Sequence, residues 1–234
     1  MASGAQAASQ VAQLVLLDSD FGALPDVVAE GRRVINNIQR SASLFLVKNI
    51  FSLLLSLAAL CLPLAYPFQP LQLSLLSAVT IGLPSFVLAL EPNYEMVRGK
   101  FIHNVLHAAL PGGLTDFLLV FCAQGFAYAF DLPADALGTI STLLTLETGL
   151  IVLFQVCEPF TTLRWTLWGS CTILGLGGAV LFSPWLELVP LDLGGTLVLV
   201  VLAALVLPVL RTATHLVDQL WQAGRRLNRQ KKKA

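Results

Sequence analysis

Residues 44–62 read LFLVKNIFSLLLSLAALCL, and this stretch decides the class of fold. Lys48 is its only charged residue. A helix of about 20 apolar residues is long enough to cross the roughly 30 Å hydrocarbon core of a bilayer. A transmembrane β-strand would be about half as long and would alternate polar with apolar residues, which this stretch does not do. The stretch therefore predicts a membrane-spanning helix.

Five more apolar stretches of similar length follow along the chain. They are residues 71–90, 110–130, 137–157, 167–185 and 193–210. Charged residues make up 12% of the 234 residues and hydrophobic residues 56%, whereas a soluble globular domain carries about 25% charged residues. Too little polar surface remains to cover a particle that faces water on all sides. We expect an all-α membrane protein with a bundle of six transmembrane helices.

The formal net charge is zero, but the basic residues gather on one side of the predicted membrane. Following the chain through six crossings places all Lys and Arg residues except Lys48 on one side: Arg32, Arg33, Arg40, Arg98, Lys100, Arg164, Arg211, Arg225, Arg226, Arg229, Lys231, Lys232 and Lys233. The other side holds Asp131, Asp135, Glu187 and Asp192. Because loops rich in Lys and Arg stay in the cytoplasm, we expect a multi-pass protein of the plasma membrane with both termini cytoplasmic.

The first 24 residues lack the character of a membrane span. Residues 5–12 have a weak helical pattern, and QLVLL at 13–17 is a short apolar run typical of a buried parallel strand. The sequence holds no second strand of this kind, and a lone strand would leave both of its edges unpaired. We therefore expect residues 1–24 to be a short α/β remnant, completed either by a partner chain or by the upstream part of a longer protein.

A long helix is predicted to join this segment to the membrane. Pro25 and Asp26 are typical of a helix start, and no further proline occurs before Pro63. A helix over that range would be about 55 Å long, more than the roughly 30 Å that the membrane takes. We expect residues 25–43 to form a stalk that couples a soluble domain to the membrane, residues 44–216 to form the transmembrane domain, and residues 217–234 to form a basic cytoplasmic tail.

Polar residues in the middle of a span mark candidate sites, because each is costly in hydrocarbon. They are Lys48, Asn49 and Ser52 in the first span, and Ser77 and Thr80 in the second. Pro84 cannot donate a hydrogen bond to the Thr80 carbonyl, so we expect the second helix to break there and to expose carbonyls that a cation could bind. The alternative is a simple proline kink with small residues that serve helix packing.

Glu147 lies midway along the fourth predicted span. A carboxylate at that depth needs a proton, a partner or a cation. We expect a role in cation binding, with a neutral hydrogen-bonded glutamate or an ion pair with Lys48 as alternatives. Asp116, nearer the cytoplasmic end of the third span, is a further candidate. Carboxylate, amide and hydroxyl oxygens suit Ca²⁺, Mg²⁺ or an alkali ion.

Three stretches match the sequence pattern of a known family. Residues 8–21 read ASQVAQLVLLDSDF, residues 30–38 read EGRRVINNI, and residues 81–84 and 90–93 read IGLP and LEPN. In turn they resemble the VAKEASDIVLLDDNF, EGRRIYDNI and DGLPATALGFNPP sequences of cation-transporting P-type ATPases, most closely in a bacterial subgroup. The resemblance covers nearly the whole chain. It implies the C-terminal third of such a pump, from the end of the haloacid-dehalogenase-like phosphorylation domain through transmembrane helices five to ten.

The resemblance also implies a cation site. Three residues stand at positions where the calcium pumps have ion ligands: Asn49, Thr80 and Glu147. The resemblance places three others where those pumps have Glu, Asn and Asp, respectively: Ser52, Ser77 and Ile81. Losing two carboxylates and adding the ammonium of Lys48 weakens a site for a divalent ion. Ca²⁺, a different cation, and a role for Lys48 as an internal counter-charge are therefore all open.

The same resemblance defines what a complete pump needs. The chain has no DKTGT, TGE or TGDG motif, and phosphoryl transfer requires an acceptor, Mg²⁺ ligands and an ATP pocket. We expect this chain alone to bind no cofactor and not to hydrolyse ATP, whereas the complete pump would use ATP and Mg²⁺ on its N-terminal domains. Its expected partners are the lipid bilayer, a transported cation and those domains, and no nucleic acid. The alternative function is a non-catalytic membrane module that assembles with other transmembrane helices.

Overall fold

The computed structural model describes residues 6–17, 20–62, 66–97 and 99–231, and these residues form helices and connections without a strand. The helices are α1 (Gln6–Val11), α2 (Leu24–Cys61), α3 (Pro70–Ser77), α4 (Leu83–Leu90), α5 (Phe101–Phe130), α6 (Ala134–Val156), α7 (Thr162–Leu181) and α8 (Leu193–Lys231). A short 3₁₀ turn, η1 (Phe21–Ala23), precedes α2, and a π-helical turn, η2 (Ala78–Gly82), joins α3 to α4. Arg98, Lys232 and Lys233, which support the predicted orientation, lie outside the described residues.

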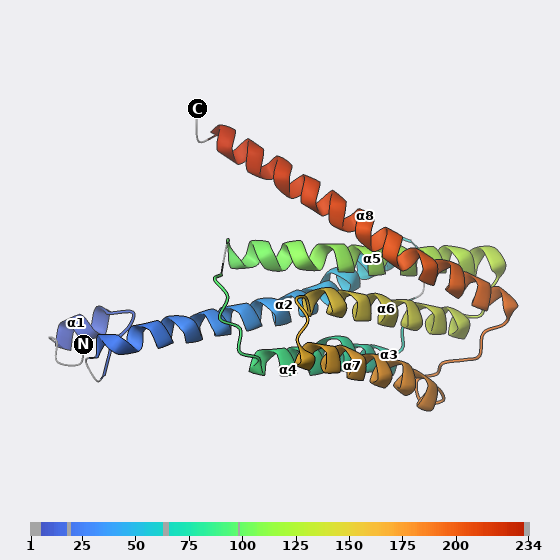
Figure 1. Cartoon of the computed structure of the whole chain (residues 1–234). Coiled ribbons are helices and arrows are strands. Elements are labelled where there is room, and N and C mark those ends of the chain that lie inside the picture. Colours follow the sequence, from blue (N-terminus) through green and yellow to red (C-terminus); the bar gives the residue numbers. More distant parts are fainter. Residues whose placement is uncertain (1–5, 18–19, 63–65, 98, 232–234) are drawn as a thin grey trace.

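The helix α2 is continuous over 38 residues, as its proline-free sequence predicts. Pro25 lies in its first turn, where the missing N–H leaves no hydrogen bond unmade. At 1.5 Å per residue the helix is about 57 Å long. Its N-terminal part extends beyond the other helices of the bundle, and α1 lies at its far end (Figure 1).

The strand predicted for residues 13–17 is absent from the described part of the chain. These residues are irregular, and the side chains of Leu14 and Leu17 are exposed. Asp18, at which the predicted strand would end, lies outside the described residues. A single apolar run cannot form a ladder without a second strand to receive its hydrogen bonds. The α/β remnant is therefore not confirmed.

From α2 onward the chain runs back and forth along one axis (Figure 1). The connection between α4 and α5 and that between α6 and α7 lie at the end where the stalk enters, and the other three connections lie at the opposite end. Five segments are long and apolar enough to cross a membrane: Phe21–Cys61, Pro70–Leu90, Phe101–Phe130, Ala134–Val156 and Leu193–Gly224. The protein is thus an all-helical, multi-pass membrane protein.

The predicted count of six spans is not confirmed, because α7 is not among these five segments. The predicted span over 167–185 extends past the end of the helix at Leu181. The 20-residue helix begins near Arg164 and contains several threonine and glycine residues, all of which lower its mean hydropathy. Its outer face is nevertheless apolar, with Ile173 and Val180 more than two-thirds exposed.

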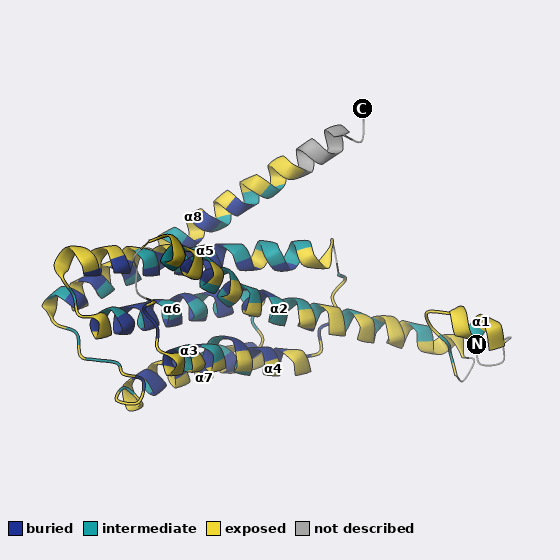
Figure 2. Cartoon of the chain, turned by 180° about the vertical axis from the view of Figure 1, so that it is seen from behind, coloured by how far each residue is buried: buried dark blue, intermediate teal, exposed yellow. Residues whose placement is uncertain are grey.

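The helix α6 lies at the centre of the bundle. Of its most apolar stretch 67% is buried, compared with 28% for α8 and 22% for α2. Figure 2 shows the exposed outer faces of α7 and α8 and the exposed N-terminal half of α2. Leu146, Leu150 and Leu153 of α6 pack in the larger hydrophobic cluster, together with Val47 and Phe51 of α2.

Two adjacent glycines bring α5 close to α2. A Cβ added at Gly113 would lie 2.8 Å from the Cβ of Ile50 and 3.0 Å from the Val47 carbonyl oxygen. One added at Gly112 would lie 2.8 Å from a methyl group of Val152 on α6. Small residues permit close backbone approach between transmembrane helices, so these glycines fix the contact between the stalk-bearing helix and the centre of the bundle.

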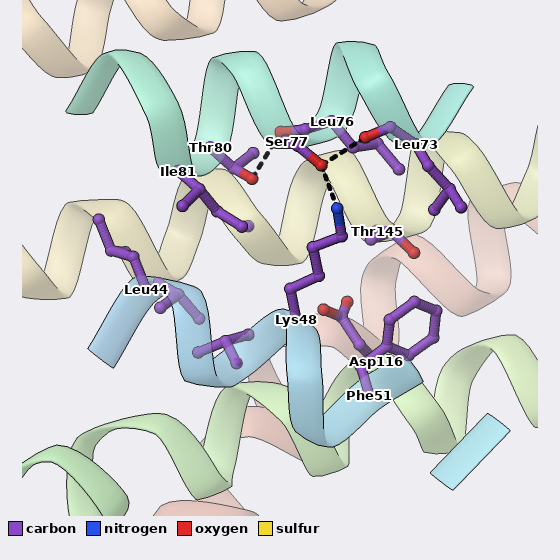
Figure 3. A pocket seen from close by; sticks show the side chains of 13 residues that line it. Leu44, Lys48, Phe51, Leu73, Leu76, Ser77, Thr80, Ile81, Asp116 and Thr145 are labelled. Atoms are coloured by element: carbon purple, nitrogen blue, oxygen red, sulfur yellow. Dashed lines mark hydrogen bonds between the residues drawn. The ribbon is translucent and has the colours of Figure 1, made fainter. Parts of the chain in front are cut away.

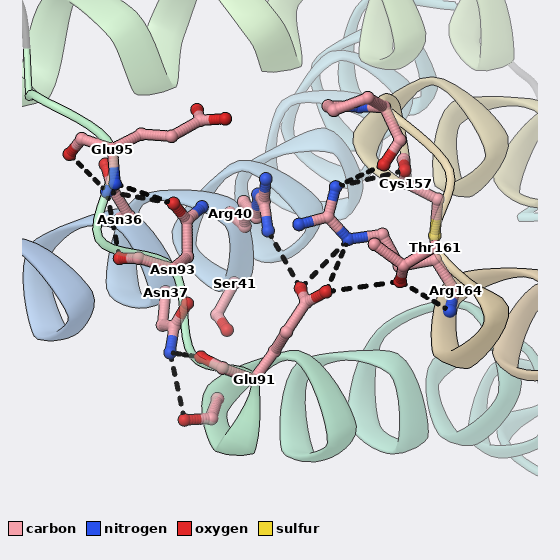
Figure 4. Close-up of polar contacts among 12 residues, drawn as sticks. Asn36, Asn37, Arg40, Ser41, Glu91, Asn93, Glu95, Cys157, Thr161 and Arg164 are labelled. Carbon is pink, nitrogen blue, oxygen red and sulfur yellow. Dashed lines mark hydrogen bonds and ion pairs between the residues drawn. The ribbon is translucent and has the colours of Figure 1, made fainter.

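A buried ion-pair cluster joins α2, α4 and α7 at the end where the stalk enters (Figure 4). The Nε of Arg164 donates to both carboxylate oxygens of Glu91, at 2.8 and 2.9 Å. Arg40 of α2 donates to the same carboxylate at 3.1 Å. Arg164 also donates to the carbonyls of Cys157 and Pro159, so its guanidinium closes the connection between α6 and α7 as well.

Two asparagines of the stalk hold the segment that follows α4 (Figure 4). The Asn37 amide donates to the carbonyls of Ala89 and Glu91, at 3.0 and 2.9 Å. The Asn36 amide donates to the Glu95 carbonyl at 2.9 Å. The N-terminal part of α2 is therefore attached to the end of α4 by hydrogen bonds as well as by the Arg40–Glu91 pair.

Replacing Arg164 by methionine should destabilise the fold, because the buried carboxylate of Glu91 loses the Nε donor that contacts both of its oxygens. Removing one member of a buried ion pair costs about 3 kcal/mol. The thermal unfolding midpoint of the chain in lipid nanodiscs should fall clearly. The control is Arg33→Met, which removes an exposed pair with Glu30 and should change the midpoint little. Equal midpoints for the two variants would contradict a structural role for the cluster.

Candidate cation site

The backbone distortion expected at Pro84 is present, but it is a wide turn and not a break. Over Ala78–Gly82 the helix opens to a π-helical turn, in which the Leu83 N–H donates to the Ala78 carbonyl five residues earlier. Helical geometry then continues from Leu83 to Leu90. The prediction that the helix unwinds at Pro84 was therefore wrong. Pro84 cannot donate a hydrogen bond to the Thr80 carbonyl, and the helix accommodates this loss with one extra residue in the turn. Turns of this kind are frequent at functional sites.

A small pocket lies against this turn (Figure 3). Its volume is about 40 Å³, and it is enclosed by α2, α3, η2, α5 and α6. Its polar side chains are Lys48, Ser77, Thr80, Asp116 and Thr145. One water molecule needs about 10–15 Å³ of such space, so the pocket has room for a small ion without a full hydration shell.

Lys48 extends from α2 toward α3, and its ammonium donates to the hydroxyl of Ser77. The Ser77 hydroxyl in turn donates to the Leu73 carbonyl at 2.5 Å. The Thr80 hydroxyl donates to the Leu76 carbonyl at 2.7 Å. Both hydroxyl protons thus point to the helix backbone, which leaves the oxygen lone pairs to accept from the pocket side.

Opposite these hydroxyls lie two oxygen atoms without a hydrogen-bond partner in the described structure. They are the Oδ1 of Asp116 and the Oγ1 of Thr145, and both residues line the pocket. Asp116 is only 3% exposed, and Thr148 of α6 lies within hydrogen-bond reach of its carboxyl group. The pocket therefore contains one acid and one ammonium.

The remaining predicted residues lie elsewhere. Asn49 is exposed, and Ser52 is half-buried outside the pocket. Glu147 is half-buried and lines a separate cavity of about 650 Å³, together with Trp168 of α7 and Leu199 of α8. Residues two apart on a helix point to different sides, so Thr145 and Glu147 face different cavities. The structure thus groups Lys48 with Ser77 and Thr80, and cation binding by Asn49, Ser52 and Glu147 stays a prediction.

The sequence reasoning missed Thr145. Its helix carries threonine at positions 142, 145 and 148, followed by glycine at 149. Residues spaced by three and four share a helix face, and a polar face in the middle of a span indicates contact with protein or water. That spacing was the signal that could have identified the α6 wall of the pocket.

Soft metal ligands do not gather in the described part of the chain. No group of three or more His, Cys, Asp or Glu side chains there could hold a metal ion. Burial raises the pKa of the Cys157 thiol to about 11, so this thiol is neutral at physiological pH. The candidate site offers hydroxyl and carboxyl oxygens, which suit a hard cation, beside the ammonium of Lys48, which repels one.

The described structure thus combines apolar spanning helices, the long continuous helix α2 and a small pocket with polar side chains at a distorted turn. Over most of its length the chain is homologous to cation-transporting P-type ATPases. It is 38% identical over 199 residues to calcium-transporting ATPase CtpE of Mycobacterium tuberculosis, which covers 78% of this chain and 24% of the relative. It is 39% identical over 188 residues to the protein of the same name in Mycolicibacterium smegmatis, with 74% and 24% covered.

A third relative is the probable cation-transporting ATPase exp7 of Streptococcus pneumoniae. It is 35% identical over 174 residues, which are 70% of this chain and 22% of that protein. The chain thus spans about a quarter of the length of these curated relatives, and the match lies in their C-terminal part. No family model and no solved structure matches the chain.

The wall between α6 and η2 gives a test of the pocket geometry. A Cβ added at Gly149 would lie 2.7 Å from the Cγ2 of Thr80, so Gly149→Ala should push η2 away from α6. We expect this overpacking to lower the free energy of unfolding by about 1–3 kcal/mol, and therefore to lower the thermal unfolding midpoint in nanodiscs. The control is Gly177→Ala on α7, where an added Cβ meets nothing within 4 Å. An unchanged midpoint for Gly149→Ala would show that α6 and η2 are not in this contact.

Proposed function

We propose that this chain is the cation-translocating membrane part of a P-type, ATP-driven pump. The observation that carries the proposal is the small pocket at the π-helical turn, which Lys48, Ser77 and Thr80 line in the interior of an apolar bundle. Polar groups at such depth are costly and mark ion pathways. The relatives named as calcium- or cation-transporting ATPases support the same conclusion. ATP and Mg²⁺ would act on other domains of the complete pump.

The fold suggests how movement would reach the pocket. Lys48 lies on α2, the same continuous helix that forms the stalk. Asn37 and Arg40 attach that stalk to the end of α4, two turns beyond η2. A displacement of the stalk would therefore move both walls of the pocket, α2 and η2, relative to α6. The function of residues 25–43 as a stalk, and the division into segments at residues 24, 43 and 216, remain part of this proposal.

We also propose that α7 crosses the membrane, which gives six spans with both termini in the cytoplasm. The charge that lowers its hydropathy belongs to Arg164, whose guanidinium is paired with Glu91 and therefore does not face lipid unpaired. Basic residues at the stalk end of the bundle support the orientation. The plasma membrane is the proposed location.

The transported ion is proposed to be a hard cation. Ca²⁺ is the ion in the names of several relatives, and the ammonium of Lys48 would oppose a second positive charge in the pocket. Asn49, Ser52 and Glu147 are retained as candidate ligands along the route, since a pump rearranges its helices. Lys48 would act as the internal counter-charge.

Transport can be measured in a chimera that joins this chain to the N-terminal three quarters of the Mycolicibacterium smegmatis relative. We expect ATP-dependent cation uptake into inverted membrane vesicles. Thr80→Val should lower the apparent cation affinity at least about tenfold, because a hard cation loses one oxygen ligand. Thr166→Val, which removes an exposed threonine hydroxyl on α7, is the matched control. A chimera that inserts but never responds to any cation would favour the alternative of a non-catalytic interaction module.

Single cysteines test the number of spans. In a background without native cysteines, Tyr94→Cys lies between α4 and α5 and Ser183→Cys lies between α7 and α8. A membrane-impermeant maleimide should label Ser183→Cys from outside intact cells and Tyr94→Cys only in inverted vesicles. Labelling of Ser183→Cys only in inverted vesicles would show that α7 does not cross.

A further inference from the structure

The pocket holds one acid that the family resemblance does not assign. Asp116 lies on α5, is 3% exposed, and lines the pocket with an Oδ1 atom that has no hydrogen-bond partner. Thr145 of α6 lines the same pocket and its hydroxyl oxygen is likewise unpartnered in the described structure. The buried oxygens of Ser85, Ser141 and Thr142 also lack a partner in the described structure, but they do not line this pocket. A buried polar group without a partner needs an explanation, such as an ion or water that binds there.

We propose that Asp116 and Thr145 form the anionic half of the cation pocket, and that Lys48 is a tethered cation that competes with the transported ion for Asp116. This inference rests on the proposed function. Ser77 holds the ammonium of Lys48 on the α3 side of the pocket, as Figure 3 shows. The Asp116 carboxyl group is then free to bind an ion, and Lys48 moves to Asp116 when the ion leaves.

Charge balance supports this exchange. Asp116 is the only acid and Lys48 the only base among the residues that line the pocket. A buried carboxylate without a positive partner is strongly disfavoured, so a deprotonated Asp116 needs an ion or Lys48 beside it and otherwise takes up a proton. The four-carbon side chain of lysine is flexible enough to serve two acceptors. The volume of about 40 Å³ is too small for a hydrated ion and the ammonium to occupy the same position.

The exchange has consequences that depend on the charge of the ion. Coulomb repulsion by Lys48 is proportional to the charge of the bound cation. Removing that repulsion by Lys48→Met should therefore gain twice as much binding free energy for a divalent ion as for a monovalent ion. Because affinity depends exponentially on free energy, a gain of about tenfold for a monovalent ion corresponds to about 100-fold for a divalent ion. A residue with a purely structural role would not produce this dependence.

Ser77 separates the proposal from a simple ligand set. If Ser77 only restrains Lys48, Ser77→Ala releases the ammonium to Asp116 and weakens cation binding about tenfold, because a competing charge now occupies the site. The same substitution should have no effect in a Lys48→Met background. If Ser77 were an ordinary ligand of the ion, Ser77→Ala would weaken cation binding equally with Lys48 and with Met at position 48.

The experiment uses the complete chain in lipid nanodiscs, titrated separately with the chlorides of Na⁺, K⁺, Mg²⁺ and Ca²⁺, with the thermal unfolding midpoint as the readout. Lys48→Met should bind at least one of these ions at least tenfold more tightly than the unmodified chain, and Asp116→Asn should abolish that binding. The control is Asp135→Asn, an exposed acid outside the pocket, which should change nothing. The proposal is overturned if Asp116→Asn has no effect, or if no ion stabilises Lys48→Met.

A second measurement needs no ion and covers variants that bind poorly or fold poorly. In the ion-free chain the ¹⁵N signal of the Lys48 ammonium should shift when Asp116→Asn is introduced, because Lys48 then loses its carboxylate partner, and it should not shift when the control Asp135→Asn is introduced. Absence of the first shift overturns the exchange. The transport chimera separates the two proposals. If cation uptake does not respond to Asp116→Asn, this inference alone is wrong. If the chain binds ions as predicted but the chimera shows no uptake, the proposed function alone is wrong.

Discussion

Hydrocarbon offers no hydrogen-bond partners, and this constraint explains most polar contacts of the protein. Hydroxyl groups in the spanning helices donate to the carbonyl four residues earlier, as Ser77, Thr80 and Thr148 do. The carboxylate of Glu91 is shared between two arginines, and the stalk asparagines donate to carbonyls that follow the end of α4. Some buried oxygens nevertheless lack a partner in the described structure, among them those of Ser85, Ser141 and Thr142, and those of Asp116 and Thr145 are the ones that line the pocket.

The sequence was sufficient for features that depend on length and composition. The apolar stretches predict five of the spanning segments, and the absence of proline predicts the continuous helix α2. It was insufficient where a property depends on a partner. Arg164 lowers the hydropathy of α7, and only the structure shows that Glu91 pairs with it. The apolar run at 13–17 has the composition of a strand, but a strand requires a neighbour that the described residues do not supply.

The candidate site was predictable in part for a related reason. Ser77 and Thr80 are three residues apart, so they share a helix face, and both lie within two turns of Pro84. The sequence alone therefore places them near the distorted turn. Periodicity within one helix cannot determine which side of that helix meets which neighbour. Glu147 was chosen for its depth in the span, yet α6 turns Thr145 and Gly149 toward Thr80 and leaves Glu147 toward α7 and α8. The approach of α5 through Gly112 and Gly113, which brings Asp116 inward, is a tertiary feature.

The length of α2 has a mechanical consequence. A rigid helix of about 57 Å that pivots at its Cys61 end and tilts by about 5° moves its other end sideways by about 5 Å, close to the pitch of one helical turn. The Lys48 position, about two-thirds of the way toward the pivot, would shift by less than half of that distance. The geometry of α2 is therefore that of a reducing lever, in which a large displacement of the Leu24 end corresponds to an ångström-scale displacement at Lys48.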